Sequence, residues 1–157
     1  MKLTAKGRYA VMAVADMAAQ TDSVQPFDVH TAPIIPLRDI STRQGISIQF
    51  LEQLFGKLRK AGLVESVRGV KGGYKLSHDP RHMRLSAIIS AVNEDIKAHG
   101  CTPETKKACN GLTSRCLTHN LWGALEAHIG NFLEHVSVQD VVDDTVHLPE
   151  LALEAAQ

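Results

Sequence analysis

The apolar and polar positions along the chain first predict a buried N-terminal helix. Residues 5–20 follow Thr4, a residue type that caps helices, and their apolar side chains are spread widely enough for a largely buried element. Segment 21–36 carries three prolines and few helix formers, which predicts a loop. A short second helix is expected over 37–44, ending in a tight turn at Gly45.

A third helix is predicted over 48–61, with Ser47 as its N-terminal cap and Gly62 closing it. Its apolar side chains share one face at helical spacing, and they are Phe50, Leu51, Leu54, Phe55 and Leu58. A helix, a glycine turn and a second helix with a polar face fit a helix-turn-helix, whose second helix enters the major groove of DNA. On these residues alone, an ordinary helical hairpin remains an alternative.

A β-hairpin is predicted next. Residues 63–67 and 74–76 have the pattern of short strands, and the glycine-rich tip 68–73 joins them. A hairpin directly after a recognition helix is a wing, and Arg68 and Lys71 at its tip would meet phosphates or a narrow minor groove. A phosphate-binding P-loop is excluded because the tip lacks the Gly-x-x-x-x-Gly-Lys-Ser/Thr pattern.

Three further helices are expected. One covers 85–92 with Ser86 as its cap, and a short capped one covers 137–144 before a fraying tail. Between them a long helix over 118–135 has apolar residues at the 3.6-residue period, with Trp122 beside them: Leu121, Leu125, Ile129, Phe132 and Leu133. This stripe suggests a homodimer formed through the long helix, and packing on its own domain is the alternative.

Composition indicates a folded chain and a divided charge. The 157 residues are 44% hydrophobic and 22% charged, and the net charge is zero. Residues 1–80 nevertheless hold 11 Lys and Arg against 7 Asp and Glu, while residues 81–157 are acidic. Most of the excess comes from Arg38, Arg43, Lys57, Arg59, Lys60, Arg68, Lys71 and Lys75. No apolar run is long enough for a transmembrane helix and Asp16 interrupts any signal-like segment, so a cytoplasmic protein is expected.

Candidate metal chemistry lies in one segment. Cys101, Cys109 and Cys116 precede His119 in the pattern Cys-x7-Cys-x6-Cys-x2-His, and the odd number of cysteines argues against a closed disulfide framework. Thiolates are soft ligands that suit iron–sulfur clusters, zinc and Cu(I). Because no short Cys-x2–4-Cys knuckle is present, the spacing favours an iron–sulfur cluster over zinc, with a thiol switch as a third alternative. An enzyme using Cys116 and His119 is disfavoured, since neither an oxyanion-type motif nor a third orienting group is evident.

Several motifs, in this order, resemble the IscR-like family of winged helix-turn-helix transcription factors over about residues 1–144. They include Met-Lys-Leu-Thr-Ala-Lys-Gly-Arg-Tyr-Ala-Val at 1–11, Arg43-Gln44-Gly45-Ile46-Ser47, Gly72-Gly73-Tyr74 and Cys116-Leu117-Thr118-His119-Asn120-Leu121-Trp122. The resemblance implies a homodimer that binds promoter DNA, and a 2Fe–2S cluster whose occupancy alters that binding. It further implies control of iron–sulfur cluster biogenesis genes and contact with cluster delivery proteins. The implied cluster ligands are Cys101, Cys109, Cys116 and His119.

The same resemblance assigns DNA contacts to the start of the recognition helix and to the wing arginine: Ser47, Gln49, Phe50, Glu52, Gln53 and Arg68. Lys71 joins them because of its charge at the wing tip. Gln49 and Phe50 stand where close relatives usually have Ser and Tyr, and the cysteine spacers are longer than the usual five residues. A nitric-oxide-sensing or redox-sensing repressor of the same fold with a 4Fe–4S cluster is one alternative, and a zinc-binding DNA-binding protein is another.

The expected architecture is therefore mainly α, with a small β-hairpin wing, a cysteine-bearing loop and a long dimerisation helix. We expect a winged helix-turn-helix domain over 1–93 and a cluster-binding loop over 94–117. The dimerisation helix and the short helix after it would occupy 118–144, and a flexible tail 145–157.

Overall fold

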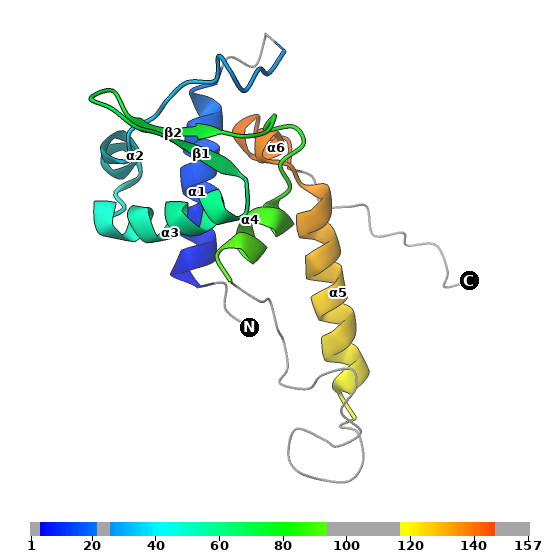
Figure 1. Ribbon diagram of the computed structural model, residues 1–157. Helices are drawn as coiled ribbons and strands as arrows, with labels where there is room; N and C mark the ends of the chain where they lie inside the picture. The colour runs from blue at the N-terminus through cyan, green and yellow to red at the C-terminus, as the bar shows by residue number, and fades with distance from the viewer. Residues whose placement is uncertain (1–3, 22–25, 94–116, 147–157) are drawn as a thin grey trace.

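The computed structural model describes residues 4–21, 26–93 and 117–146 (Figure 1). Its elements in chain order are α1 (Ala5–Ala19), α2 (Leu37–Gln44), α3 (Ile48–Lys60), β1 (Val64–Val67), β2 (Gly73–Leu76), α4 (Leu85–Ala91), α5 (His119–His135) and α6 (Val138–Val142). The two strands form an antiparallel hairpin in which Val64 pairs with Leu76 and Val67 with Gly73. The mainly α fold with a winged helix-turn-helix is confirmed. None of the helices in the described ranges is long and apolar enough to cross a membrane.

Helix α1 is the centre of the core. Helices α2, α3, α4 and α6 all pack against it (Figure 1). Small residues such as Ala10 and Ala13 are fully buried on α1, which lets neighbouring helices approach closely. The largest fully buried side chains are mostly aliphatic: Phe55, Met17, Ile40, Leu51, Leu54, Leu58, Ile88, Val14, Val64, Val92 and Val138.

Local signals set the boundaries of the helix-turn-helix. Gly45 ends α2 with a φ of +65°, a left-handed conformation that glycine adopts without strain. The Ser47 hydroxyl accepts a hydrogen bond from the Phe50 backbone N–H at 3.3 Å and so caps α3. Gly62, with a φ of +75°, follows the end of α3. The predicted bounds of both helices are confirmed to within one residue.

The predicted cap of α4 is wrong. Arg84 is the N-cap residue and makes no side-chain capping bond, while Ser86 lies inside the helix. The Leu85 N–H is bound instead by the Val136 carbonyl at 3.1 Å, within an antiparallel bridge between Arg84 and Ser137. A backbone partner from a distant segment thus takes over part of the role that a local cap usually fills.

The wing is held by the loop that precedes α2. Ile35 and Tyr74 exchange two backbone hydrogen bonds of 2.8 and 2.9 Å. A Cβ on Gly73 would lie 2.5 Å from the Ile35 carbonyl oxygen, so this close pairing requires glycine. The Lys75 ammonium donates to the Val29 carbonyl at 3.0 Å and pairs with Glu65 at 3.3 Å.

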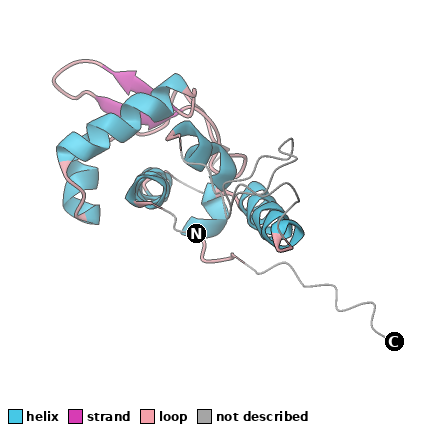
Figure 2. Cartoon of the chain, turned by 90° about the horizontal axis from the view of Figure 1, so that it is seen from below, coloured by secondary structure: helices cyan, strands magenta, loops and turns pink. Residues whose placement is uncertain are grey.

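Helix α5 lies largely outside the body of the fold. Only its last turn joins the core, through Phe132 and Leu133, and Arg84 donates to the His135 carbonyl at 3.1 Å. Seen from below, α5 and the hairpin stand on opposite sides of the molecule (Figure 2). Helix α6, which a capping box at Ser137 begins, then returns to pack on α1.

A buried carboxylate fixes the helix-turn-helix to α1. Asp16, whose side chain is 4% exposed, accepts hydrogen bonds from Arg43 Nε at 3.0 Å, Arg43 Nη2 at 2.7 Å and Gln44 Nε2 at 2.8 Å. These hydrogen bonds favour the charged guanidinium and raise the pKa of Arg43 above its ordinary value, against the opposing effect of burial. Because Arg43 and Gln44 are the last residues of α2, the carboxylate holds the turn before α3 in place.

Asp16→Asn should lower the free energy of unfolding by about 2 kcal/mol. Breaking a fully buried ion pair costs roughly 3–5 kcal/mol; the loss should be smaller here because the Arg43 side chain is 37% exposed. Urea unfolding followed by circular dichroism measures the change. Asp79→Asn, which removes the partner of exposed Arg81 at 3.1 Å, is the matched control and should cost less. Equal losses in the two variants would contradict a special role for Asp16.

Candidate nucleic-acid interface

Helix α3 presents a polar face to solvent. At about 100° of rotation per residue, Gln49, Glu52 and Gln53 fall within an arc of roughly 100°. All three side chains are exposed, and the opposite face, with Leu51 and Leu54, is buried in the core. The structure therefore brings these three predicted DNA contacts together on one surface.

Ser47 and Phe50 also have roles inside the chain. Besides capping α3 with its hydroxyl, Ser47 is exposed at the start of the helix. The Phe50 ring packs edge-on against Tyr9, with 5.8 Å between ring centroids and an 88° angle between planes. The Arg8 guanidinium lies 5.7 Å from the centre of the Tyr9 ring. Phe50 is half-buried and anchors the first turn of α3 to α1, and its predicted base contact stays a prediction.

The wing tip carries exposed cations. Gly69 has a φ of +123°, and a Cβ on Gly72 would lie 2.6 Å from the Val67 carbonyl oxygen, so both glycines permit the tight tip. Arg68 and Lys71 are exposed there, and neither has a side-chain partner among the described residues. The tip extends toward the end of the molecule where α3 begins (Figure 1).

Five other basic residues of segment 38–75 have partners within the chain, and two of them, Arg38 and Arg59, bind Asp39 and the Ser66 hydroxyl. Arg43 binds Asp16, Lys75 binds Glu65 and the Val29 carbonyl, and Lys57 donates to the Val92 carbonyl at 3.1 Å. In the sequence alone, these cations cannot be distinguished from one another. The fold separates those that hold elements together from those, such as Arg68 and Lys71, that face solvent.

The Lys57 bond joins α3 to the end of α4. Val92 is the C-terminal cap residue of α4, and Asn93 follows it with a φ of +59°. A cation bound to the last carbonyl groups of a helix also complements the helix dipole. The recognition helix is therefore attached directly to the element from which the chain continues into segment 94–116.

The predicted metal ligands fall mostly outside the described residues. Cys101, Cys109 and Cys116 lie in segment 94–116, and nothing is described of their placement. His119 is the first residue of α5 and is half-buried. Within the described ranges no group of three His, Cys, Asp or Glu side chains is arranged to hold a metal ion. The ligand set therefore stays a prediction.

Comparison with known proteins adds family information to this geometry. Residues 3–144 match the Rrf2 family model, described as an iron-dependent transcriptional regulator. The chain is 49% identical to the HTH-type transcriptional regulator IscR of Aliivibrio salmonicida over 92% of this chain and 79% of that protein. It is 45% identical to the regulator of the same name from Yersinia pseudotuberculosis, over 92% and 80% respectively.

Solved structures share the architecture. IscR of T. potens superposes with a TM-score of 0.66 at 30% identity, covering 100% of this chain and 94% of that one. CymR, the global cysteine regulator of B. subtilis, has a TM-score of 0.71 at 24% identity over 92% and 98% of the two chains, a likeness of fold. With a family match over most of its length and close relatives that are transcriptional regulators, the chain belongs to the Rrf2 family of iron-dependent transcriptional regulators.

Proposed function

We propose that this regulator is a homodimer that binds promoter DNA through α3 and the wing, and that an iron–sulfur cluster alters this DNA binding. The observations that support the proposal are the exposed polar face of α3 and the exposed cations of the wing tip, which extends toward the end of the molecule where α3 begins (Figure 1). It would act by binding rather than by catalysis, in the cytoplasm, on genes for iron–sulfur cluster biogenesis. Cluster delivery proteins would be its partners for loading.

The proposed DNA contacts divide into base-reading and phosphate-binding groups. Gln49 and Gln53 carry amides that suit adenine edges, and Glu52 carries a carboxylate that can accept from cytosine N4 in the major groove. Arg68 and Lys71 would meet the minor groove or its phosphates. The interface thus combines sequence reading on α3 with charge on the wing.

Arg68→Ala should cost about 1–3 kcal/mol of DNA binding if Arg68 enters a groove. Lys71→Ala should weaken binding to all sequences alike. It should also reduce the slope of the logarithm of the binding constant against the logarithm of the salt concentration (the salt slope) by about one. Fluorescence anisotropy with labelled duplexes at several salt concentrations measures both. Arg81→Ala removes a cation that pairs with Asp79 instead, and should leave binding unchanged. Wild-type affinity in both wing variants would remove the wing from the interface.

The proposed dimer uses the uncovered face of α5. Leu121 is 59% and Trp122 39% exposed, and none of the 17 residues of α5 is buried. A helix of this length is about 25 Å long, and a second copy supplies a complementary apolar stripe by symmetry. Two copies would present two recognition helices to successive half-sites of a promoter.

Leu121→Glu should convert the dimer to a monomer, because it places a charge within the apolar stripe. Sedimentation velocity measures the mass of the particle. Ala127→Glu introduces the same charge on the opposite face of α5 and should leave the dimer intact. A dimer that survives Leu121→Glu at micromolar concentration would argue against this face.

The cluster ligands proposed are Cys101, Cys109, Cys116 and His119. Three thiolates and one imidazole form a donor set that suits a 2Fe–2S cluster, with 4Fe–4S and zinc as the alternatives. The cluster would supply an inorganic centre whose presence depends on iron–sulfur supply. A ligand shifts an equilibrium only through different affinities for two states, so cluster ligation must favour one conformation of the chain that follows α4. The Lys57 hydrogen bond to Val92 would link that conformation to the position of α3.

Protein purified without oxygen should be coloured and contain iron and acid-labile sulfide in equal amounts. Cys116→Ser should lose both, since it removes one of the thiolates. Visible absorption with iron, sulfide and zinc analysis measures the content. Zinc without sulfide, or a colourless protein after attempted reconstitution, would overturn the cluster assignment while leaving DNA binding to be measured separately.

Footprinting of the apo and cluster-loaded forms on the same duplexes tests the switch itself. The two forms should differ in sequence preference, and Lys57→Met should retain the cluster while the difference shrinks. Identical sequence preferences of the apo and cluster-loaded wild-type protein would contradict cluster-dependent DNA binding.

A further inference from the structure

The interior of α3 contains a glycine, Gly56, that no contact among the described residues requires. A Cβ built on Gly56 meets no heavy atom within 4 Å, whereas one on Gly73 would collide with the Ile35 carbonyl. Glycine in a helix interior is disfavoured relative to alanine because it has more conformational freedom to lose. A Cβ at Gly56 would therefore meet none of the described atoms and would favour the helix, and the bare backbone leaves room there for a partner to approach α3 closely.

Gly56 lies on the proposed DNA-facing surface. It lies seven positions after Gln49, which places the two within roughly 20° of each other around α3. Glu52 and Gln53, one turn earlier, flank the same line. The surface thus changes along the helix from polar side chains to bare backbone.

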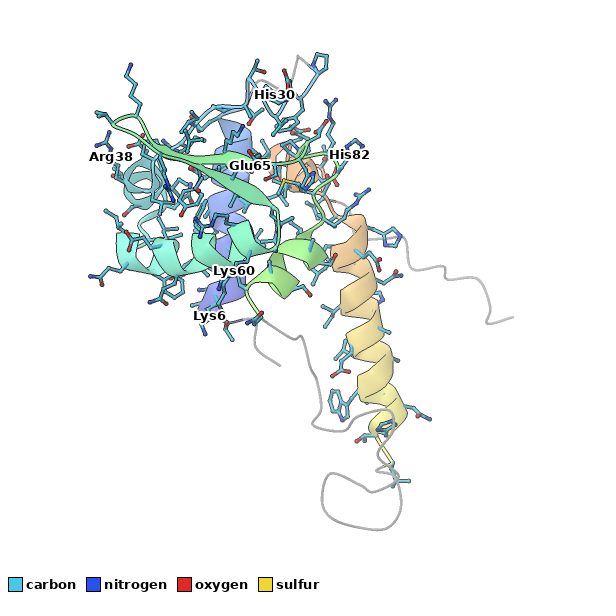
Figure 3. The ribbon with its side chains drawn as sticks, viewed as in Figure 1. Lys6, His30, Arg38, Lys60, Glu65 and His82 are labelled. Atoms are coloured by element: carbon cyan, nitrogen blue, oxygen red, sulfur yellow. The ribbon has the colours of Figure 1, made fainter. Side chains whose placement is uncertain are left out.

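A cation stands one turn beyond the bare position. Lys60 is exposed, four residues after Gly56, and its ammonium has no partner among the described residues. Figure 3 labels it near the C-terminal end of α3. Its neighbour Arg59 differs, because it donates to the Ser66 hydroxyl of β1 at 3.4 Å.

The distance along the helix indicates which part of DNA would lie there. At a rise of about 1.5 Å per residue, Gly56 stands about 12 Å from Ile48, close to the width of the major groove of about 12 Å. If the first turns of α3 occupy the groove, Gly56 lies where the helix passes a sugar–phosphate wall. A phosphate strand at that wall is negatively charged and would attract the exposed Lys60 ammonium.

We propose that a phosphate strand of duplex DNA crosses α3 in direct contact with the backbone at Gly56, and that Lys60 binds the phosphate there. The inference rests on the proposed DNA-binding function and adds a sequence-independent contact to it. Gly56 is a positioning residue: the missing side chain lets α3 sit deep enough for Gln49 and Glu52 to reach base edges. Any side chain at this position would hold the strand away from the helix.

Gly56→Ala and Gly56→Leu test the contact, with a fluorescent duplex of arbitrary sequence at low salt as the probe. Gly56→Ala should raise the thermal unfolding midpoint yet weaken DNA binding. Gly56→Leu should weaken binding roughly tenfold, the scale of one lost charge-assisted hydrogen bond. Lys60→Ala should weaken binding and reduce the salt slope by about one. Combined with Gly56→Leu it should add little, because both changes affect the same phosphate.

Gly130→Ala is the matched control. Gly130 lies inside α5, a Cβ there also meets nothing within 4 Å, and it faces away from the Leu121 stripe. This variant should gain stability without losing DNA affinity. If Gly56→Leu also lost stability, its weaker binding could come from unfolding. The Gly56→Ala variant would then test the contact, because alanine stabilises the helix.

Wild-type affinity in folded Gly56→Ala and Gly56→Leu proteins would overturn the inference and leave the proposed function standing. Absence of duplex binding by the wild-type protein, with the wing variants equally inactive, would overturn the proposed function and this contact with it.

Discussion

The hydrogen bonds to the Asp16 carboxylate are the interaction on which the position of α3 depends. It is nearly inaccessible to water in the last turn of α1, and it accepts hydrogen bonds from the last two residues of α2. Burying a carboxylate is unfavourable unless its charge and lone pairs are satisfied. The side chains of Asp16, Arg43 and Gln44 must therefore keep this one geometry, because any other loses the stabilising hydrogen bonds. Because α3 begins only a few residues later, the direction of the recognition helix follows from this geometry. Phe50 packed on Tyr9 provides a second, apolar attachment of the same helix to α1.

Helix α1 also links parts of the chain that are far apart in sequence. Helix α6, near the C-terminal end of the described residues, packs on it, and the end of α5 is bound through Arg84 and the bridge to Ser137. On the opposite side, the wing is braced by Ile35 and by the Lys75 bond to Val29. Helices α5 and α4 are thus connected to α3 through helix packing and the Lys57 hydrogen bond rather than through a loop.

The basic residues show why charge counting alone describes a surface poorly. Arg43 and Lys57 are as basic as Arg68 and Lys71 in the sequence, yet the first two are committed to Asp16 and Val92. Only the cations without internal partners are available to neutralise phosphates at no cost to the fold. The net charge of the first half of the chain thus overstates the charge offered to DNA, and the position of each cation in the fold decides its role.

The sequence by itself determined the elements whose signals are local. Thr4, Ser47 and Gly45 mark helix ends because capping and left-handed turns involve residues within one turn of each other, and the 3.6-residue period identifies the buried face of α3. The motifs around the wing likewise indicated the family. The tertiary structure alone decided what depends on distant partners: the start of α4 at a backbone bridge instead of at Ser86, the burial of Asp16, the half-buried setting of Phe50 and the open space at Gly56. These features depend on groups that folding brings together from remote positions, and no spacing along the chain encodes such a distance.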